Sequence, residues 1–175
     1  MNHPAPPDAE ALYLRLRELV RDWLSSQAAA PTLVGIYSGG AWLAQRLHED
    51  LRPGTPLGVV SSTLHRDDFG TRGLHPSGNR TELPFDVNGR SILLVDDVLY
   101  TGRTIRAAIN EIYDFGRPAR IDLAVLVDRG GRELPICAGI VGASVELPPH
   151  RMLALERADA DGGQALRMVY LESQS

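Results

Sequence analysis

Short apolar runs of strand length recur along this chain, and segments with helical spacing separate most of them. The strand candidates are residues 32–37, 56–64, 91–98, 120–128, 140–147 and 165–172. The helix candidates, in which apolar residues recur every three or four positions, are residues 8–27, 39–51 and 102–115. Because parallel strands need a long crossover connection, usually a helix, this alternation indicates βαβ units. The sequence therefore predicts an α/β fold with a mainly parallel central sheet flanked by helices.

The composition is that of an ordinary globular chain, with 43% hydrophobic and 23% charged residues, and indicates one domain over residues 1–175. The formal net charge of −4 gives no general attraction to nucleic acid or to a membrane surface. A single cysteine, Cys137, excludes an intramolecular disulfide and a multi-cysteine metal site. No apolar run approaches the roughly 20 residues of a spanning helix, and the first ten residues lack a signal-peptide pattern. We expect a cytoplasmic protein.

All 18 basic residues are arginines, and the chain contains no lysine. A bias toward GC-rich codons is the simplest explanation, but the chemical consequence is independent of the cause. Schiff-base catalysis and Walker-type phosphate binding both need a lysine, so both are excluded. A phosphate group bound by this chain would have to be held by arginine, by a metal ion or by backbone N–H groups.

The most informative stretch is the strand candidate 91–98 together with the turn that follows it. Its apolar run Ile92–Val95 leads directly into Asp96 and Asp97, and Thr101–Thr104 then opens the next helix candidate. Two carboxylates after a buried strand are costly unless hydrogen-bond donors or a cation meet them. A helix start, by contrast, favours an anion. A ribose 5-phosphate satisfies both demands, because its hydroxyls suit the carboxylates and its phosphate suits the turn.

Adjacent aspartates after a strand also occur in receiver domains, in hydrolases and as plain turn residues. The longer string VDDVLYTGRTIRAA, with VLVDRGGRELPI downstream, resembles the phosphoribosyl pyrophosphate (PRPP) motif of type I phosphoribosyltransferases. It is most similar to one branch, the pyrimidine operon regulator and uracil phosphoribosyltransferase family, PyrR. The close resemblance covers about residues 91–136, and LVGIYSGGAWLAQRL and LHRDDF extend a weaker one over most of the chain.

This resemblance implies a type I phosphoribosyltransferase fold and a reaction in which PRPP, carrying Mg²⁺, gives its ribose 5-phosphate to uracil. The products would be UMP and pyrophosphate. Asp96 and Asp97 would hold the ribose hydroxyls and, indirectly, the metal ion. Tyr100 replaces the aspartate that purine-salvage relatives carry at this position, which favours a pyrimidine base. The expected PRPP-binding residues are Val95, Asp96, Asp97, Val98, Tyr100, Thr101, Gly102, Arg103 and Thr104.

Two further segments are implied by the resemblance. The expected base-binding residues are Val127, Asp128, Arg129, Met152 and Leu153. A flexible hood loop at about residues 62–90 would close over PRPP and exclude water. In this hood, Arg66 would reach the pyrophosphate, and Asp67 or Asp68 would support the metal ion or Arg66. The catalytic residues expected on this basis are Asp96, Asp97 and Arg66.

The chain departs from the family pattern at the pyrophosphate loop after the first strand. A basic residue and Thr-Arg are usual there, but this chain carries Tyr37, Ser38, Gly39 and Gly40. Backbone N–H groups of Ser38–Gly40 can still form an anion-binding nest. The loop's own cations are missing, however, so weak catalysis is expected unless Arg66 or Arg46 compensates.

The basic surface of RNA-binding members is also reduced in this chain. Gly131 and Arg132 stand where His-Arg is usual, and Cys137 replaces a further basic residue. Arg15, Arg17 and Arg21 of the first helix candidate could contribute instead, although Arg15 and Arg17 point apart, so RNA binding stays open. Two hypotheses follow: a uracil phosphoribosyltransferase, or a catalytically weak regulator that binds PRPP or UMP and acts through RNA or a protein partner. In both, we expect a homo-oligomer without membrane contact.

Overall fold

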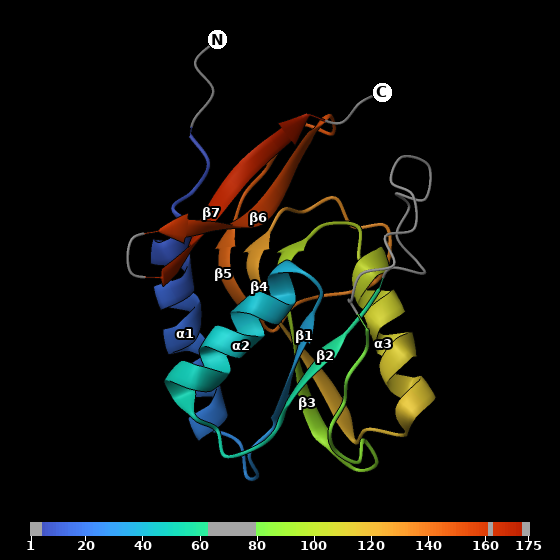
Figure 1. Ribbon diagram of the computed structural model, residues 1–175. Coiled ribbons are helices and arrows are strands. Elements are labelled where there is room, and N and C mark those ends of the chain that lie inside the picture. The colour runs from blue at the N-terminus through green and yellow to red at the C-terminus, as the bar shows by residue number, and fades with distance from the viewer. Residues whose placement is uncertain (1–4, 63–79, 161–162, 173–175) are drawn as a thin grey trace.

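The computed structural model describes residues 5–62, 80–160 and 163–172 (Figure 1). Its main sheet has five strands, all parallel, in the order β2-β1-β3-β4-β5. The strands are β1 (Thr32–Ile36), β2 (Leu57–Val60), β3 (Ser91–Leu99), β4 (Arg120–Asp128) and β5 (Ile140–Ser144). The predicted parallel sheet is thereby confirmed, and each of its strands falls on a strand candidate of the sequence.

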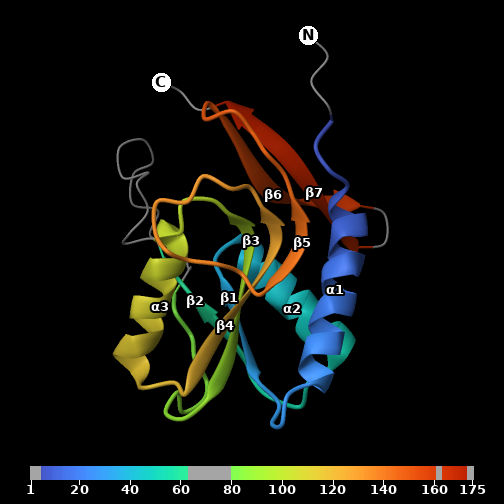
Figure 2. The same cartoon turned by 180° about the vertical axis from the view of Figure 1, so that it is seen from behind.

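Three helices cover the two faces of this sheet: α1 (Ala9–Ser25), α2 (Gly39–Leu51) and α3 (Arg103–Phe115). Helices α1 and α2 lie on one face and α3 lies on the other, as two opposite views show (Figure 1 and Figure 2). The N-cap of α1 is Asp8, whose carboxylate accepts hydrogen bonds from the backbone N–H groups of Glu10 and Ala11. None of the helices described is both long enough and apolar enough to cross a membrane.

The central strand β3 is buried on both faces, because its side chains alternate between two hydrophobic clusters. Leu93 and Val95 join the cluster that contains α1 and α2, whereas Ile92 and Leu94 join the cluster that contains α3. All four side chains are fully buried. This double burial explains the continuous apolar run in the sequence, and it anchors the carboxyl end of β3 rigidly between its neighbours.

A second, two-stranded sheet lies beyond the carboxyl ends of the main strands (Figure 1). In it, β6 (Arg151–Ala160) pairs antiparallel with β7 (Gly163–Glu172). The sequence predicts only β7, because charged residues and alanines interrupt β6. The structure shows the alternation of a half-buried strand there, with Leu153 and Leu155 both buried. The backbone N–H of Leu155 reaches the carboxylate of Asp97, so this hairpin contacts the acidic pair.

The segment between β2 and β3 is described only from residue 80 onward. A single antiparallel bridge joins Val59 to Glu82, and Val87 is buried in the cluster on the α3 side of the sheet. Residues 80–90 therefore pack against the domain. Residues 63–79 lie outside the described residues, and with them the expected hood residues Arg66, Asp67 and Asp68.

Candidate active site

The expected site residues converge because three neighbouring strands end at the same edge of the sheet. Strand β3 pairs with β1 on one side and with β4 on the other, all in parallel. Leu99 at the end of β3 lies in register with Asp128 at the end of β4. Open parallel sheets bind ligands at this edge. The segments that follow β1, β3 and β4 are therefore the ones that can form a common site.

The two carboxylates of β3 are met by backbone donors, which answers the cost of placing them after a buried strand. Asp96 is 4% exposed, and its Oδ1 accepts a hydrogen bond of 3.0 Å from the backbone N–H of Asp97. Asp97 is only partly buried. Its Oδ1 accepts from the N–H of Val98 at 2.9 Å, and its Oδ2 accepts from the N–H of Leu155 at 3.3 Å. Backbone N–H groups thus contribute to holding both side chains in place.

Flanking Val95 and Val98 belong to the hydrophobic packing of β3. Val95 is fully buried, and the partly buried Val98 packs against the same cluster. Val95 can therefore contribute to PRPP binding only through its backbone, whereas the side chain of Val98 keeps some exposed surface.

The turn after β3 has the form expected of an anion-binding helix start. Gly102 is the N-cap of α3 and has a φ of 93°, a conformation that glycine adopts without strain. The N–H of Arg103 donates to Oγ1 of Thr101 at 3.2 Å, which closes the turn. Thr104 lies in the first turn of α3 and is partly exposed, whereas the guanidinium of Arg103 forms an ion pair with Glu133.

The loop after β1 packs directly onto the acidic pair. A Cβ atom at Gly39 would lie 2.5 Å from Oδ2 of Asp97, and one at Gly40 would lie 2.3 Å from the carbonyl oxygen of Val95. Only glycine fits at either position without displacing these atoms. The loop also contains a cis peptide bond between Tyr37 and Ser38.

The expectation that Arg46 compensates for the missing cations of this loop is not supported. Its guanidinium forms an ion pair with Glu10 at 2.8 Å and lies over the ring of Tyr13, 4.0 Å from the centroid. Arg46 therefore joins α2 to α1. Among the described residues it supplies no charge to the loop Ser38–Gly40.

On the other side of the acidic pair, Arg129 stacks on Tyr100. The guanidinium carbon lies 3.7 Å from the ring centroid, and the Arg129 side chain is almost completely buried. Its Nη1 donates to Sδ of Met152 and its Nη2 to the carbonyl oxygen of Pro148, both at 3.2 Å. The Nε atom is buried and has no hydrogen-bond partner among the described residues. Such a group is costly to bury and suits a site that is completed by a ligand.

The other expected base-binding residues differ in what they can offer. Val127 is fully buried, so only its backbone can contact a base. The carboxylate of Asp128 pairs with Arg132. Met152 is 37% exposed beside Arg129, whereas the side chain of Leu153 is buried in the core cluster and turned away from the solvent. Met152 is therefore the better placed of the two alternatives.

Sequence reasoning did not predict how the 128–136 segment supports the turn after β3. The N–H groups of Glu133 and Leu134 both donate to the carbonyl oxygen of Thr101, at 3.0 and 3.1 Å. These are backbone contacts between residues more than 30 positions apart, and no local pattern in the sequence announces them.

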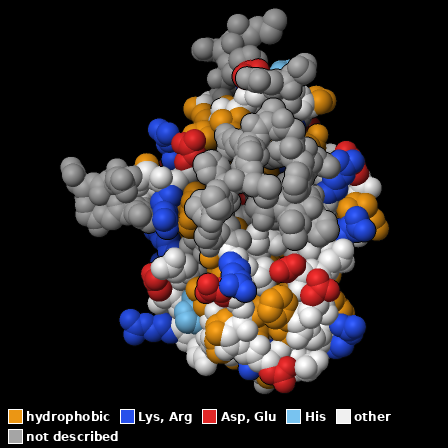
Figure 3. Space-filling model, turned by 45° about the vertical axis from the view of Figure 1, so that its right-hand side comes forward, with side chains coloured by type: hydrophobic (Ala, Val, Ile, Leu, Met, Phe, Trp, Pro, Cys, Tyr) orange, Lys and Arg blue, Asp and Glu red, His pale blue; other side chains and the backbone are white. Residues whose placement is uncertain are grey.

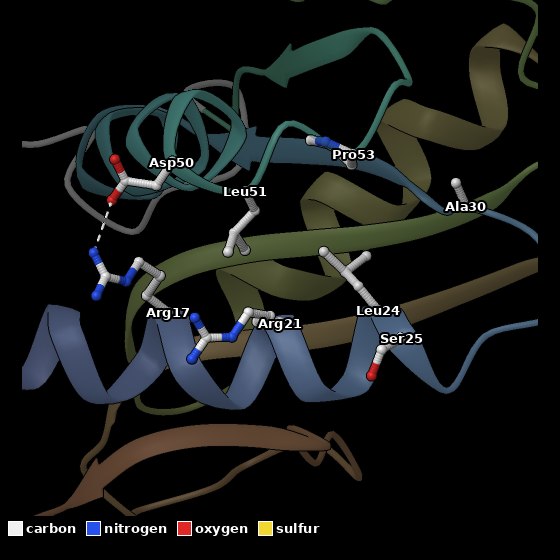
Figure 4. A pocket seen from close by; sticks show the side chains of 8 residues that line it. All are labelled: Arg17, Arg21, Leu24, Ser25, Ala30, Asp50, Leu51 and Pro53. Carbon is white, nitrogen blue, oxygen red and sulfur yellow. Dashed lines mark ion pairs between the residues drawn. The ribbon is translucent and has the colours of Figure 1, made fainter.

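A separate groove of about 600 Å³ lies at the opposite end of the sheet, between the last turns of α1 and α2 (Figure 4). Arg17 on its wall pairs with Asp50 at 3.6 Å, and Ala30 precedes the amino end of β1. Its lining residues are Arg17, Arg21, Leu24, Ser25, Ala30, Asp50, Leu51 and Pro53. None of the residues at the β3–α3 turn contributes to it.

Comparison with known proteins agrees with this geometry. Residues 8–146 match the model of the phosphoribosyl transferase domain. Over 159 residues the chain is 50% identical to the "Bifunctional protein PyrR" of Ralstonia nicotianae, covering 90% of each chain. A protein of the same name from Pseudomonas putida is 42% identical over 175 residues, covering 95% of this chain and all of the other. The chain belongs to the PyrR family.

Solved structures support the fold independently of sequence. A hypoxanthine phosphoribosyltransferase from Staphylococcus aureus superposes with a TM-score of 0.63 at 18% identity, covering 82% of this chain and 77% of the other. A hypoxanthine-guanine phosphoribosyltransferase from Bacillus anthracis gives a TM-score of 0.62 at 15% identity and covers 87% of each chain. At such low identity these likenesses show the fold alone. The expected type I phosphoribosyltransferase fold is confirmed.

Proposed function

We propose that this protein transfers ribose 5-phosphate from PRPP to uracil, giving UMP and pyrophosphate, and that it also serves as a pyrimidine operon regulator. The observation that carries the proposal is the junction of β3 and α3. There, the buried pair Asp96 and Asp97 lies directly before an anion-binding turn, Thr101–Thr104, at the carboxyl edge of a parallel sheet. Membership of the PyrR family supports a PRPP-binding role for this junction.

The chemistry requires positioning more than a protein nucleophile. The bond from C1 of the ribose to the pyrophosphate oxygen breaks, a bond from C1 to uracil N1 forms, and the N1 proton is released. Asp96 and Asp97 would bind the ribose hydroxyls, and their negative charge would stabilise the cation-like sugar of the transition state. The turn Thr101–Thr104 would hold the 5-phosphate by its backbone N–H groups and hydroxyls. Fixing both ends of the ribose aligns C1 with the base.

The acidic pair fits Mg²⁺ that arrives with the substrate. Mg²⁺ commonly takes one or two carboxylates together with substrate phosphates and waters, and does not need a cage made by the protein alone. Asp96 and Asp97 would hold the ion through its waters. When bound, the ion neutralises charge on the departing pyrophosphate.

The base pocket would lie between Tyr100 and the end of β4. A tyrosine cannot act as the carboxylate that exchanges a proton with a purine ring, so the pocket suits a pyrimidine. The backbone of Val127 and Asp128 would bind the uracil edge. Arg129, with its unpartnered Nε, would add a donor toward a carbonyl oxygen of the base.

A second candidate function, a regulator that binds PRPP or UMP with weak catalysis, is favoured by the pyrophosphate loop. The loop Ser38–Gly40 has no cationic side chain, and Arg46 is engaged by Glu10. A lost charged phosphate contact commonly costs about 1.5–3 kcal/mol. Under this candidate, the pocket would bind UMP or the ribose 5-phosphate end of PRPP, but it would hold the pyrophosphate end weakly and transfer would be slow.

The described surface gives little support for an RNA partner in the regulatory role. Arg17 and Arg21 both form ion pairs with Glu18, and Arg132 is turned inward. Figure 3 shows acidic and basic side chains interspersed over the coloured part of one face. Counterion release on RNA binding needs clustered unpaired cations. An RNA partner would therefore have to be held by a small number of contacts or by more than one copy of the chain.

The test is nucleotide formation by the purified protein with Mg²⁺ and PRPP, using uracil, orotate, hypoxanthine, guanine and adenine as separate acceptors. We expect UMP from uracil and little product from any purine. A clear preference for a purine would contradict the proposal. PRPP or UMP binding without measurable product would favour the regulator with weak catalysis.

A further inference from the structure

Arg132 makes an unusual set of contacts at the centre of the candidate site. Its Nε donates to the carbonyl oxygen of Ile136 at 2.9 Å, and its Nη1 donates to the carbonyl oxygen of Tyr100 at 2.7 Å. Its Nη2 forms an ion pair of 2.5 Å with Oδ2 of Asp128. Each nitrogen of the guanidinium thus binds a different segment: the end of β4, the residue before the phosphate turn, and the chain that returns toward β5.

These contacts lie directly behind the turn that is expected to hold the 5-phosphate. Tyr100 precedes Thr101, whose own carbonyl oxygen accepts from the N–H groups of Glu133 and Leu134. A Cβ atom at Gly102 would lie 3.3 Å from Cβ of Ile136, which shows how closely the turn rests on this segment. Contacts with residues 132–136 therefore fix the position of the turn.

The guanidinium is largely committed to the protein, because each of its three nitrogens binds a protein oxygen. This distinguishes Arg132 from Arg129, whose Nε finds no hydrogen-bond partner in the part of the chain that the structure describes. A side chain committed in this way influences the reaction through the groups that it holds.

We propose that Arg132 is a positioning residue for the transfer reaction. It fixes the distance between the phosphate turn after β3 and the base-binding end of β4, so that C1 of the ribose meets the base at reacting distance. Its role in this chain is therefore to hold segments of the site together. The inference rests on the proposed function, because it assigns the turn to the 5-phosphate and the end of β4 to the base.

The test compares Arg132→Gln and Arg132→Lys with a matched control, Arg120→Gln. Arg120 also lies at an end of β4 and pairs with an aspartate of its own segment, Asp122, but at the amino end of the strand. The first readout is amide hydrogen exchange at Glu133 and Leu134 without ligand. The second is the dissociation constant of ribose 5-phosphate, measured by calorimetry well below the melting temperature of each variant.

We expect Arg132→Gln to speed exchange at both amides and to weaken ribose 5-phosphate binding by roughly tenfold or more, since small misplacements of a binding group are costly. Arg132→Lys, which keeps the charge but not the planar fork, should recover only part of the affinity. Arg120→Gln should match the wild type in both readouts. If Arg132→Gln does not fold, the lysine variant carries the same comparison.

Arg132 variants that are less stable but bind ribose 5-phosphate as tightly as the wild type would overturn the inference, because that result describes a merely structural residue. Unchanged exchange at Glu133 and Leu134 would overturn it as well. Failure of the wild type to bind ribose 5-phosphate at all would instead contradict the proposed function, and this inference with it.

Discussion

At the scale of single residues, the contact between Gly39 and Asp97 brings the loop after β1 against the acidic pair at the end of β3. The missing side chain at Gly39 lets the loop after β1 rest against the carboxylate that is expected to hold the ribose. Glycine is needed here for close approach, since its φ lies outside the left-handed range. Replacement by arginine, the residue usual in the family, would therefore push on Asp97 before it could supply a charge.

We predict that Gly39→Ala lowers PRPP affinity by roughly tenfold or more, because its Cβ must displace a carboxylate of the site. Calorimetry with Mg²⁺ and PRPP measures this effect. Gly139→Ala is the matched control, since a Cβ there meets no atom within 4 Å. Equal affinity in Gly39→Ala and the wild type would show that the position of Asp97 does not matter for PRPP.

Asp96→Asn and Asp97→Asn test the acidic pair itself. Each asparagine keeps the size of the side chain and one acceptor oxygen, so the backbone contacts that hold the pair largely survive. The lost charge should weaken PRPP binding by about 10–100-fold, the range for hydrogen bonds to charged groups. The melting temperature of each variant should stay close to that of the wild type. Asp122→Asn, at the amino end of β4, should leave PRPP binding unchanged. Full affinity in either pair variant would remove that residue from the ribose site.

At the scale of elements, a polar network joins α1, α2 and β7 away from the site. Glu10 on α1 accepts hydrogen bonds from Arg46 on α2 and from the backbone N–H of Leu166 on β7. The hydroxyl of the buried Tyr13 donates to Asp50 at 2.6 Å, and burial raises the pKa of Tyr13 above its ordinary value. The network orients the hairpin whose Leu155 contacts Asp97.

The hydrogen bond from Arg46 lowers the pKa of Glu10 below its ordinary value of 4.5. Because the folded-state pKa is lowered, Glu10 stabilises the fold above its unfolded-state pKa and loses this contribution as the pH falls through the folded-state pKa. Glu10→Gln should therefore lower the melting temperature by about 1–3 °C at neutral pH, as expected for a partly exposed pair. The difference from wild type should shrink in acid. Thermal scans from pH 7 to 3 measure it.

The matched control for this pH dependence is Glu49→Gln. Glu49 is an exposed residue of α2 whose carboxylate accepts from Gln45. Its substitution should leave the melting curve nearly unchanged at every pH. If the difference in melting temperature between Glu10→Gln and the wild type grows as the pH falls, Arg46 is not the partner that stabilises the Glu10 carboxylate.

The elements that the sequence predicts correctly are those whose signal is local. Strand β3 is recognisable because burial of both faces gives a continuous apolar run in the sequence. The turn is recognisable because Gly102 has a positive φ, a conformation that favours glycine. Strand β6 is missed because its burial depends on pairing with β7 and on contact with the core. The roles of Arg46 and Arg132 depend on partners far along the chain, such as Glu10 and Tyr100, and a single sequence does not contain that information.

At the scale of the whole molecule, the candidate site lies at the carboxyl end of the sheet, and the groove between α1 and α2 lies at the amino end. The carboxyl end collects the loop after β1, the acidic pair, the phosphate turn and the end of β4. The amino end carries the groove between α1 and α2 and the exposed pair of Arg120 with Asp122. Substitutions at the amino end are therefore suitable controls, because they perturb the same strands without reaching the site.

The central claim is that the carboxyl edge of this sheet binds a nucleoside 5-phosphate in one defined orientation. A crystal structure with bound UMP tests it most directly. We expect the phosphate on the Thr101–Thr104 turn, the ribose hydroxyls on Asp96 and Asp97, and the uracil beside Arg129. A structure with UMP bound elsewhere, or with the turn empty while a phosphate fills another site, would contradict it.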